Sequence, residues 1–138
     1  MTPTELVERF HIELWGNGDM DAIARSVAPD ATTVMTGFEG STIEVMRDDV
    51  GRYVGAFSDV ETEIVELFGD ADRVLLWWTT TGTHVGPYGD IAPEPTGRRI
   101  TMEGVDLYRV RGDMIVELRS FWDAATVYRQ FGLLADGL

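Results

Sequence analysis

The sequence predicts an α+β fold in which helices come first and an antiparallel sheet follows. Apolar residues recur at helical spacing from Pro3 to about Phe57, and from Glu61 to Trp122 the period changes to two. Segregated helices and strands are typical of the α+β class, whereas alternating βαβ units would indicate a parallel sheet. The length of 138 residues fits one domain over residues 1–138.

The first helix has a strong start signal. Thr2-Pro3-Thr4-Glu5 supplies the N-cap, the proline at the first helical position and the glutamate of a capping box. The helix is expected to end at Asn17-Gly18, with an apolar face that holds Leu6, Phe10, Ile12 and Leu14.

Two further helices flank a short strand. Asp19 can cap a helix over Met20–Val27, which is followed by a break at Pro29-Asp30. A β-rich run over Ala31–Thr36 and a turn over Gly37–Gly40 come next. A second capping box, Ser41-Thr42-Ile43-Glu44, opens a helix to about Phe57 that directs five side chains inward: Val45, Val50, Tyr53, Val54 and Phe57.

Four strands and a short helix complete the chain. The strands are expected over Glu61–Phe68, Val74–His84, Arg99–Val110 and Met114–Trp122. Turns at 69–72 and 111–113 join the first and last pairs, and a loop over Val85–Gly97 joins the middle pair. Asp123 is expected to cap a closing helix over Ala124–Phe131.

Strand parity predicts one shared face. With a three-residue hairpin loop, Val110 would pair with Met114, Asp106 with Leu118 and Gly104 with Ser120. The common face would then hold Met102, Gly104, Asp106, Tyr108, Val116, Leu118, Ser120 and Trp122, and, from the preceding strand, Leu76, Trp78, Thr80, Gly82 and His84. An apolar surface with few polar groups is the usual lining of a small-molecule site.

Composition excludes several classes of function. The net charge of −13 disfavours nucleic-acid binding. The absence of cysteine removes thiolate chemistry, and the two histidines lie too far apart in sequence to favour a metal site. No phosphate-binding loop, dinucleotide fingerprint or nucleophile elbow occurs, so no cofactor is expected. The amino-terminal residues do not resemble a signal peptide and no run is long enough to span a membrane, which predicts a cytoplasmic protein.

Several motifs together resemble one family. They are Thr83-His84-Val85-Gly86, the loop ending Pro95-Thr96-Gly97-Arg98-Arg99, the strand from Gly104 to Val110, the segment Gly112–Ile115, and Tyr128-Arg129-Gln130-Phe131-Gly132. Their order resembles the SnoaL-like polyketide cyclases of the nuclear transport factor 2-like superfamily over essentially the whole chain. The resemblance implies a cone-shaped α+β barrel, with a curved mixed or antiparallel sheet wrapped around the amino-terminal helices. It also implies a homodimer through the outer sheet face, where Val105, Leu107 and Phe121 lie.

The chain departs from the catalytic residues of these relatives. Where SnoaL-like cyclases keep an aspartate on the last strand, this chain has Ser120, and their histidine on the preceding strand is replaced by Asp106. The arginine and aspartate of limonene epoxide hydrolases correspond to Trp78 and Thr80, and the base of ketosteroid isomerases corresponds to Met35. No known catalytic set transfers intact.

Asp106 is therefore the predicted acid/base, because burial in an apolar pocket raises the pKa of a carboxyl. The competing interpretation is an outward Asp106 that pairs with Arg109 or Arg119. His84 at the pocket mouth and Ser120 complete the candidate catalytic set, although His84 could equally be a surface histidine. Candidate substrate-binding residues, which could also be ordinary core, are Trp15, Met35, Tyr53, Trp78, Thr80, Met102, Tyr108, Leu118 and Trp122.

The expected function is that of a cofactor-independent cyclase or isomerase that folds an apolar, polyketide-like small molecule and applies limited acid/base catalysis. A non-catalytic binding or interaction protein of the same fold is the alternative. An epoxide hydrolase or dehydratase is a further one. No nucleic-acid or membrane partner is expected, and no metal.

Overall fold

The structure is a computed structural model that describes residues 1–35 and 43–134. Its elements follow the expected order: α1 (Pro3–His11), the π-helix η1 (Ile12–Gly16), α2 (Asp21–Ser26), β1 (Val27–Met35), α3 (Ile43–Ala56), β2 (Phe57–Gly69), β3 (Arg73–His84), β4 (Arg99–Arg111), β5 (Met114–Trp122) and α4 (Ala124–Gln130). The predicted turn at 37–40 and the capping residues Ser41 and Thr42 lie outside the described residues. The predicted α+β class is confirmed.

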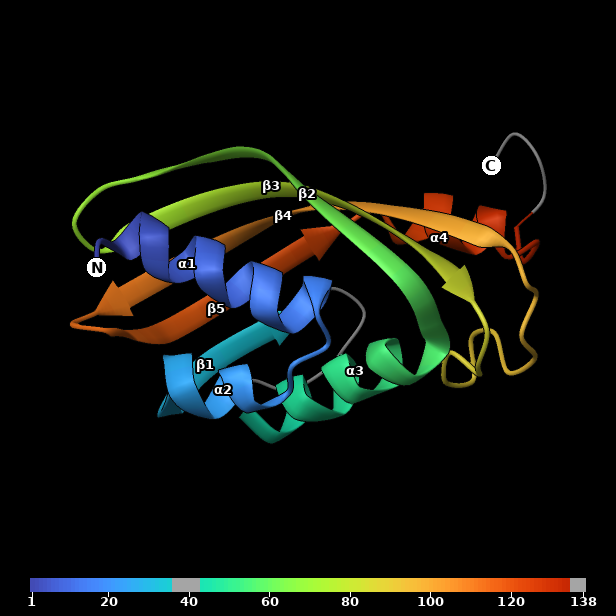
Figure 1. Cartoon of the computed structure of the whole chain (residues 1–138), viewed down its shortest axis with the longest axis horizontal. Helices are drawn as coiled ribbons and strands as arrows, with labels where there is room; N and C mark the ends of the chain where they lie inside the picture. Colours follow the sequence, from blue (N-terminus) through green and yellow to red (C-terminus); the bar gives the residue numbers. More distant parts are fainter. Residues whose placement is uncertain (36–42, 135–138) are drawn as a thin grey trace.

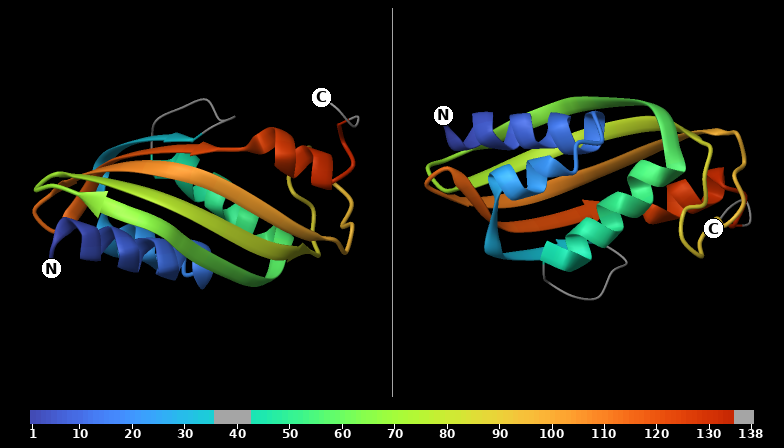
Figure 2. Two further views of the ribbon diagram at one scale, coloured as in Figure 1. Left: turned by 90° about the horizontal axis from the view of Figure 1, so that it is seen from above. Right: turned by 60° about the horizontal axis from the view of Figure 1, so that its bottom comes forward.

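The strands form one mixed sheet in the order β1-β5-β4-β3-β2. β1 runs parallel to β5, and the other neighbours are antiparallel. The sheet curves, and α1, α2 and α3 pack against its concave side, while α4 lies at the far end near the carboxyl terminus (Figures 1 and 2). The three helices therefore cover the concave side of the sheet. None of the helices within the described ranges combines the length and apolar composition that crossing a membrane requires.

The first helix begins as predicted and ends differently. Thr2 and Glu5 form the capping box, with the Glu5 amide 3.2 Å from the Thr2 hydroxyl. From Ile12 the helix continues as a π-helix, and Ile12 is 40% exposed although it was expected to face inward. Leu14, which was also expected to face inward, is fully buried.

Two strands begin earlier than the sequence indicates. β1 starts at Val27 and includes Pro29 and Asp30, which were expected to interrupt it. β1 is an edge strand, and its pairing with β5 shifts between Val27 and Thr32, which is where a proline can be accommodated. β2 starts at Phe57 with a similar shift between Ser58 and Glu61.

The β4–β5 hairpin has a different register from the predicted one. Asp106 lies opposite Ser120, not Leu118, and Gly104 lies opposite Trp122. The loop is a two-residue turn, since Arg111 pairs with Met114, and a shift follows at Arg109/Val110. The bulge buries Ile115 in place of Val116. Because the error amounts to two residues, the buried face elsewhere keeps the predicted even-numbered side chains.

Two adjoining apolar clusters fill the concave side. The larger joins α1, α2 and α3 to the middle of the sheet and includes Phe10, Ile23, Val50, Leu76 and Leu118. The smaller lies under the loop between β3 and β4 and includes Phe57, Ile100, Val127 and Phe131. Asp123 caps α4 as predicted, with its carboxylate 3.1 Å from the Thr126 amide. The carboxylate is thereby occupied at a helix end, away from the concave side.

Candidate functional site

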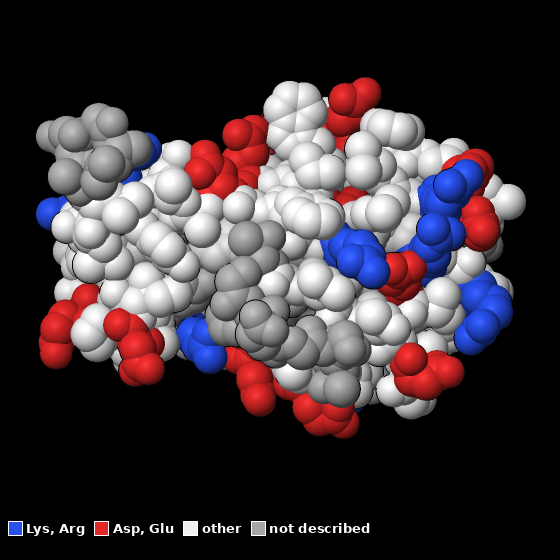
Figure 3. Space-filling view, turned by 180° about the vertical axis from the view of Figure 1, so that it is seen from behind, with Lys and Arg blue, Asp and Glu red and all other residues white. Residues whose placement is uncertain are grey.

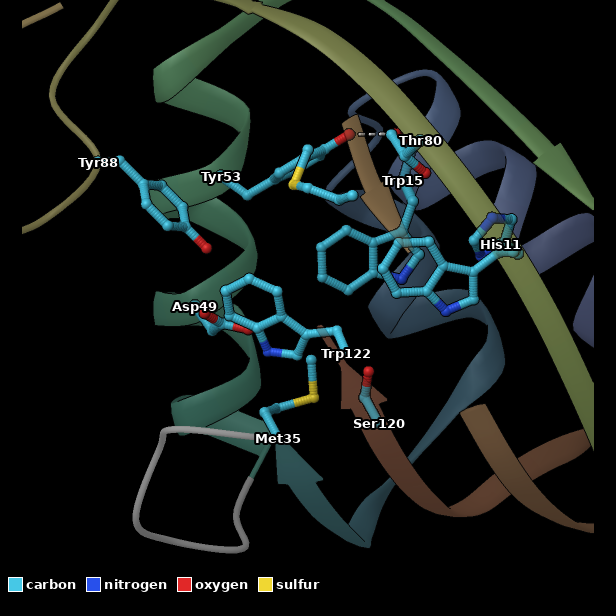
Figure 4. A pocket seen from close by; sticks show the side chains of 11 residues that line it. His11, Trp15, Met35, Asp49, Tyr53, Thr80, Tyr88, Ser120 and Trp122 are labelled. Carbon is cyan, nitrogen blue, oxygen red and sulfur yellow. Dashed lines mark hydrogen bonds between the residues drawn. The ribbon is translucent and has the colours of Figure 1, made fainter. Parts of the chain in front are cut away.

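A small cavity of about 50 Å³ lies where the two clusters meet. Its walls come from α1, η1, β1, α3, three central strands and the loop between β3 and β4 (Figure 4). The lining residues are His11, Trp15, Met35, Asp49, Tyr53, Trp78, Thr80, Tyr88, Met102, Ser120 and Trp122. Three tryptophans and two tyrosines make it an aromatic cavity with a few polar groups, which is the composition of a small-molecule site.

Most predicted binding residues line this cavity: Trp15, Met35, Tyr53, Trp78, Thr80, Met102, Trp122 and, from the catalytic set, Ser120. Tyr108 and Leu118 do not. They face the concave side as predicted, but they are fully buried under α1, where the ring of Phe10 meets Tyr108 edge-on at 6.3 Å. These two residues belong to the core beneath α1 and do not line the cavity.

Asp106 lies beneath the cavity wall and does not line the cavity. It is 2% exposed, and its carboxylate accepts hydrogen bonds from Ser120 at 2.7 Å and from Tyr108 at 3.4 Å. Burial raises the pKa of Asp106 from 3.8 to about 6, against the opposing effect of Ser120, Trp78 and Tyr108. Pairing with Arg109 or Arg119 is excluded, because both bind Glu117 on the outer face.

A glycine allows an indole to cover this carboxylate. A β-carbon at Gly104 would come within 2.5 Å of the Trp78 ring and 2.6 Å of the Phe121 carbonyl oxygen. Only glycine leaves room for Trp78 to lie over the strand next to Asp106. The buried Trp78 indole N–H has no partner of good hydrogen-bond geometry, yet it is close enough to favour a charged Asp106.

His84 does not sit at the mouth of the cavity, and neither is it a surface histidine. Its ring is fully buried between Phe57 and Phe131, with ring centroids at 5.7 and 4.8 Å. The Thr96 amide donates to Nδ1 at 3.1 Å, so this nitrogen acts as an acceptor. Desolvation lowers the pKa of His84, against the opposing effect of a backbone hydrogen bond at Gly86.

His11, which was not among the candidate site residues, also lines the cavity. It is buried, and its Nε2 lies 2.8 Å from the hydroxyl of Thr62, which in turn lies 2.9 Å from that of Thr80. Burial lowers the pKa of His11 to about 4, so its imidazole is neutral near pH 7. Thr80, Thr62 and His11 therefore form a hydrogen-bonded series of uncharged side chains at the cavity.

The sequence analysis missed Asp49 and Tyr88. Asp49 lies on α3 and Tyr88 on the loop between β3 and β4, and both are buried and line the cavity. A signal for Asp49 was present, because it lies between Met46, Val50 and Tyr53 on the inward stripe of its helix. Burial raises the pKa of Asp49 from 3.8 to about 6, with Arg52 opposing.

The site brings together carboxyls, hydroxyls and aromatic rings. Within the described ranges, no three histidine, aspartate or glutamate side chains gather as a metal ion would require. Two buried carboxyls with raised pKa values are available for proton transfer, one behind Ser120 and one in the cavity wall.

Comparisons with known proteins agree with this architecture. The family model of the SnoaL-like polyketide cyclases matches residues 5–131. No curated protein matches the sequence.

Solved structures resemble the whole chain. AclR from Streptomyces galilaeus superposes with a TM-score of 0.84 at 23% identity, covering 96% of this chain and 85% of its own. A candidate polyketide cyclase from Acidithiobacillus ferrooxidans gives 0.79 at 28% identity, covering 95% and 94%. IdmH from Streptomyces antibioticus, also a candidate polyketide cyclase, gives 0.80 at 23% identity, covering 96% and 99%. The nuclear transport factor 2-like fold predicted from the sequence is confirmed.

Proposed function

The chain belongs to the SnoaL-like polyketide cyclase family, and we propose that it is a cofactor-independent cyclase or isomerase acting on an apolar, polyketide-like small molecule. The observation that carries this proposal is the buried Asp106 carboxyl, held 2.7 Å from a hydroxyl in the wall of an aromatic cavity. A carboxyl with a pKa of about 6 exchanges protons readily near neutral pH.

Ser120 is the route between Asp106 and a substrate. When Asp106 is protonated, it can donate to the Ser120 oxygen, while the Ser120 hydroxyl donates to a ketone oxygen in the cavity. Ring closure by carbon attack on that ketone places negative charge on the oxygen. The oxygen then takes the Ser120 proton as Asp106 passes its own proton to Ser120. The family's aspartate on β5 is thus replaced by a serine that is backed by an aspartate on β4.

Substrate folding supplies the remainder of the proposed catalysis. The aromatic walls would hold the two reacting carbons together, and such orientation can account for about 7–11 kcal/mol of a barrier in favourable cases. The cavity of about 50 Å³ is smaller than the 300–1,000 Å³ typical of ligand pockets, so a polyketide needs wall residues to move apart.

Two variants test the role of Asp106. With a panel of linear and bicyclic β-polyketones and product detection by mass spectrometry, Asp106→Asn should reduce turnover by about 100-fold or more. Ser120→Ala should reduce it by at least about tenfold, because the relay is interrupted. Asp113→Asn in the exposed β4–β5 turn is the matched control and should match wild type. Unchanged turnover in Asp106→Asn would remove Asp106 from the mechanism.

The same assay separates catalysis from binding. Ligand binding, followed by quenching of tryptophan fluorescence, should survive in Asp106→Asn with a change in affinity of less than about threefold. A wild-type protein that binds these ligands and forms no product would be a binding protein. A parallel panel of epoxides tests the hydrolase alternative, for which the corresponding positions hold Trp78 and Thr80.

A homodimer through the outer sheet face is also proposed. Trp77, Val105 and Phe121 lie opposite one another across β3, β4 and β5, and Phe121 is 57% exposed. Seen from behind, acidic side chains lie mostly toward the edges of the view, basic side chains lie between the centre and the right edge, and residues of other kinds cover much of the remainder (Figure 3). Light scattering should give twice the monomer mass for wild type and the monomer mass for Phe121→Lys. A monomeric wild type would remove this proposal.

A further inference from the structure

Asp49 and Tyr88 form a polar end of the cavity that the Asp106–Ser120 pair leaves unused. Asp49 is 7% exposed and Tyr88 is 5% exposed, and both line the cavity. In Figure 4 they lie on one side, next to α3, while Ser120 and His11 lie on the other, with the rings of Trp15 and Trp122 between. The cavity therefore presents polar groups at two separate ends.

Neither polar group has a hydrogen-bond partner in the described part of the chain. Among the described residues, no donor reaches the Asp49 carboxylate and no acceptor reaches the Tyr88 hydroxyl. Their oxygens are not among the fully enclosed unpaired side-chain atoms, so they keep accessible surface where the two residues line the cavity. Their exposure to an aromatic cavity indicates that a ligand group supplies the missing bonds.

The surroundings of Asp49 do not explain it as a structural ion pair. Arg52 is the cation that favours its charged form, but no hydrogen bond joins the two side chains, and burial remains the larger effect on Asp49. The Arg52 side chain packs instead against Gly89, where a β-carbon would come within 2.9 Å of it. Gly89 has a φ of 54°, which favours glycine and lets the loop with Tyr88 approach α3.

The hydrogen-bonding capacities of Asp49 and Tyr88 determine which ligand group would fit between them. A carboxylate only accepts hydrogen bonds, whereas a tyrosine hydroxyl can donate one. A group that gives a proton to Asp49 and accepts a bond from Tyr88 at the same oxygen is a hydroxyl. Because the surrounding walls are aromatic, an enol or phenol hydroxyl on an unsaturated carbon skeleton fits both features.

We propose that Asp49 and Tyr88 form a second polar subsite that binds an enol or phenol hydroxyl of the substrate, and that Asp49 accepts its proton. As a step of cyclisation this rests on the proposed function, whereas the binding of the hydroxyl does not. The assignment makes Asp49 the general base and leaves Asp106, through Ser120, as the general acid at the opposite end.

Together, Asp49 at one end of the cavity and the Ser120–Asp106 pair at the other would remove and supply the protons that the reaction needs. The enol O–H bond breaks, the proton moves to Asp49, and the electron pair passes through the enolate to form the new carbon–carbon bond. The ketone π-electrons move to oxygen, which takes a proton from Ser120 as Ser120 takes one from Asp106. The product is an isomer of the substrate, Asp49 ends protonated and Asp106 ionised, and solvent restores the starting state. No oxidant or metal takes part in this scheme.

A matched pair of small probes tests the subsite without any knowledge of the natural substrate. Phenol and anisole share an aromatic ring, but only phenol carries a hydroxyl hydrogen. Near pH 8, where Asp49 is ionised, the wild type should bind phenol about tenfold more tightly than anisole, as measured by NMR titration. Asp49→Asn should reduce this preference to less than about twofold, and Tyr88→Phe should reduce it by about threefold.

Asp48→Asn, one residue away on the exposed side of α3, is the matched control and should keep the wild-type preference. Thermal unfolding should confirm that Asp49→Asn is folded. Equal binding of phenol and anisole to wild type, or a full preference in a folded Asp49→Asn, would overturn the subsite. If the preference depends on Asp49 but no polyketone is converted, the subsite stands and the proposed cyclase function fails.

Discussion

Asp106 and Asp49, the carboxyl side chains buried in the described part of the chain, have similarly raised pKa values and opposite surroundings. Asp106 is enclosed by Ser120 and Tyr108 with Trp78 above it, and it does not reach the cavity. Asp49 lines the cavity and receives no hydrogen bond from a described residue. Burial raises both pKa values to about 6. A shifted pKa alone therefore does not identify the group that touches a ligand; contact geometry does.

The largest expected effect is on the rate of proton abstraction, which distinguishes the roles of Asp49 and Asp106. 2-Tetralone carries activated ring protons that exchange with deuterium in heavy water, and NMR follows the exchange directly. Wild type should accelerate this exchange. The acceleration by Asp49→Asn should be about 100-fold smaller, because the variant lacks the base in the cavity wall. Asp106→Asn should lose less than Asp49→Asn. The reverse order of the two variants would assign the base to Asp106.

Stability should respond in opposite directions at the two sites. An aspartate whose pKa is raised from 3.8 to about 6 stabilises the fold less as pH rises from about 4 to about 6. The Asp49→Asn variant has no carboxyl to ionise and avoids this decrease in stability. Above about pH 6 its free energy of unfolding should therefore exceed that of wild type by about 1–3 kcal/mol. Asp106→Asn breaks a satisfied hydrogen-bond group and should cost about 1–3 kcal/mol.

Urea unfolding at about pH 5 and about pH 8 measures both effects. The gain for Asp49→Asn should grow between the two pH values. A loss of stability in Asp49→Asn at the higher pH would show that Asp49 has a structural partner.

The pH dependence of turnover gives a smaller, graded effect. The proposed reaction needs Asp49 ionised and Asp106 protonated, and both pKa values are about 6. The rate should therefore peak near pH 6 and fall on both sides, approaching about tenfold per unit. Tyr88 also lies near Asp49, and burial raises the pKa of its hydroxyl further from this range. A rate that rises steadily to pH 8 would contradict the requirement for a protonated Asp106.

Much of the fold could be predicted because it depends on local signals. The capping box at Thr2 and Glu5, the change of period after α3 and the cap at Asp123 are each set by a few neighbouring residues. The hairpin register was wrong because the bulge near Val116 depends on how β5 meets β4 and β1, which no short stretch records. The side chains predicted to face the concave side mostly do so, because the error in the hairpin register was an even number of residues.

The site was predicted less completely. Ser120 and most aromatic lining residues follow from strand parity, but parity cannot tell a cavity wall from the core beneath a helix, as Tyr108 and Leu118 show. His84 was misplaced because the fold of the 85–97 loop over its ring is a tertiary contact. Asp49 was missed although its position between Met46 and Tyr53 on α3 was visible; a carboxyl in an apolar stripe is the signal to look for.

One measurement tests most directly the claim that the two carboxyls differ in their access to ligand. Phenol is titrated into protein carrying isotope-labelled aspartate carboxyls, with Asp49→Asn and Asp106→Asn used to assign the two resonances. The Asp49 carboxyl should shift on saturation and its apparent pKa should fall, because a hydroxyl donor favours the charged form, while that of Asp106 stays unchanged. A response at Asp106 with none at Asp49 would contradict the account.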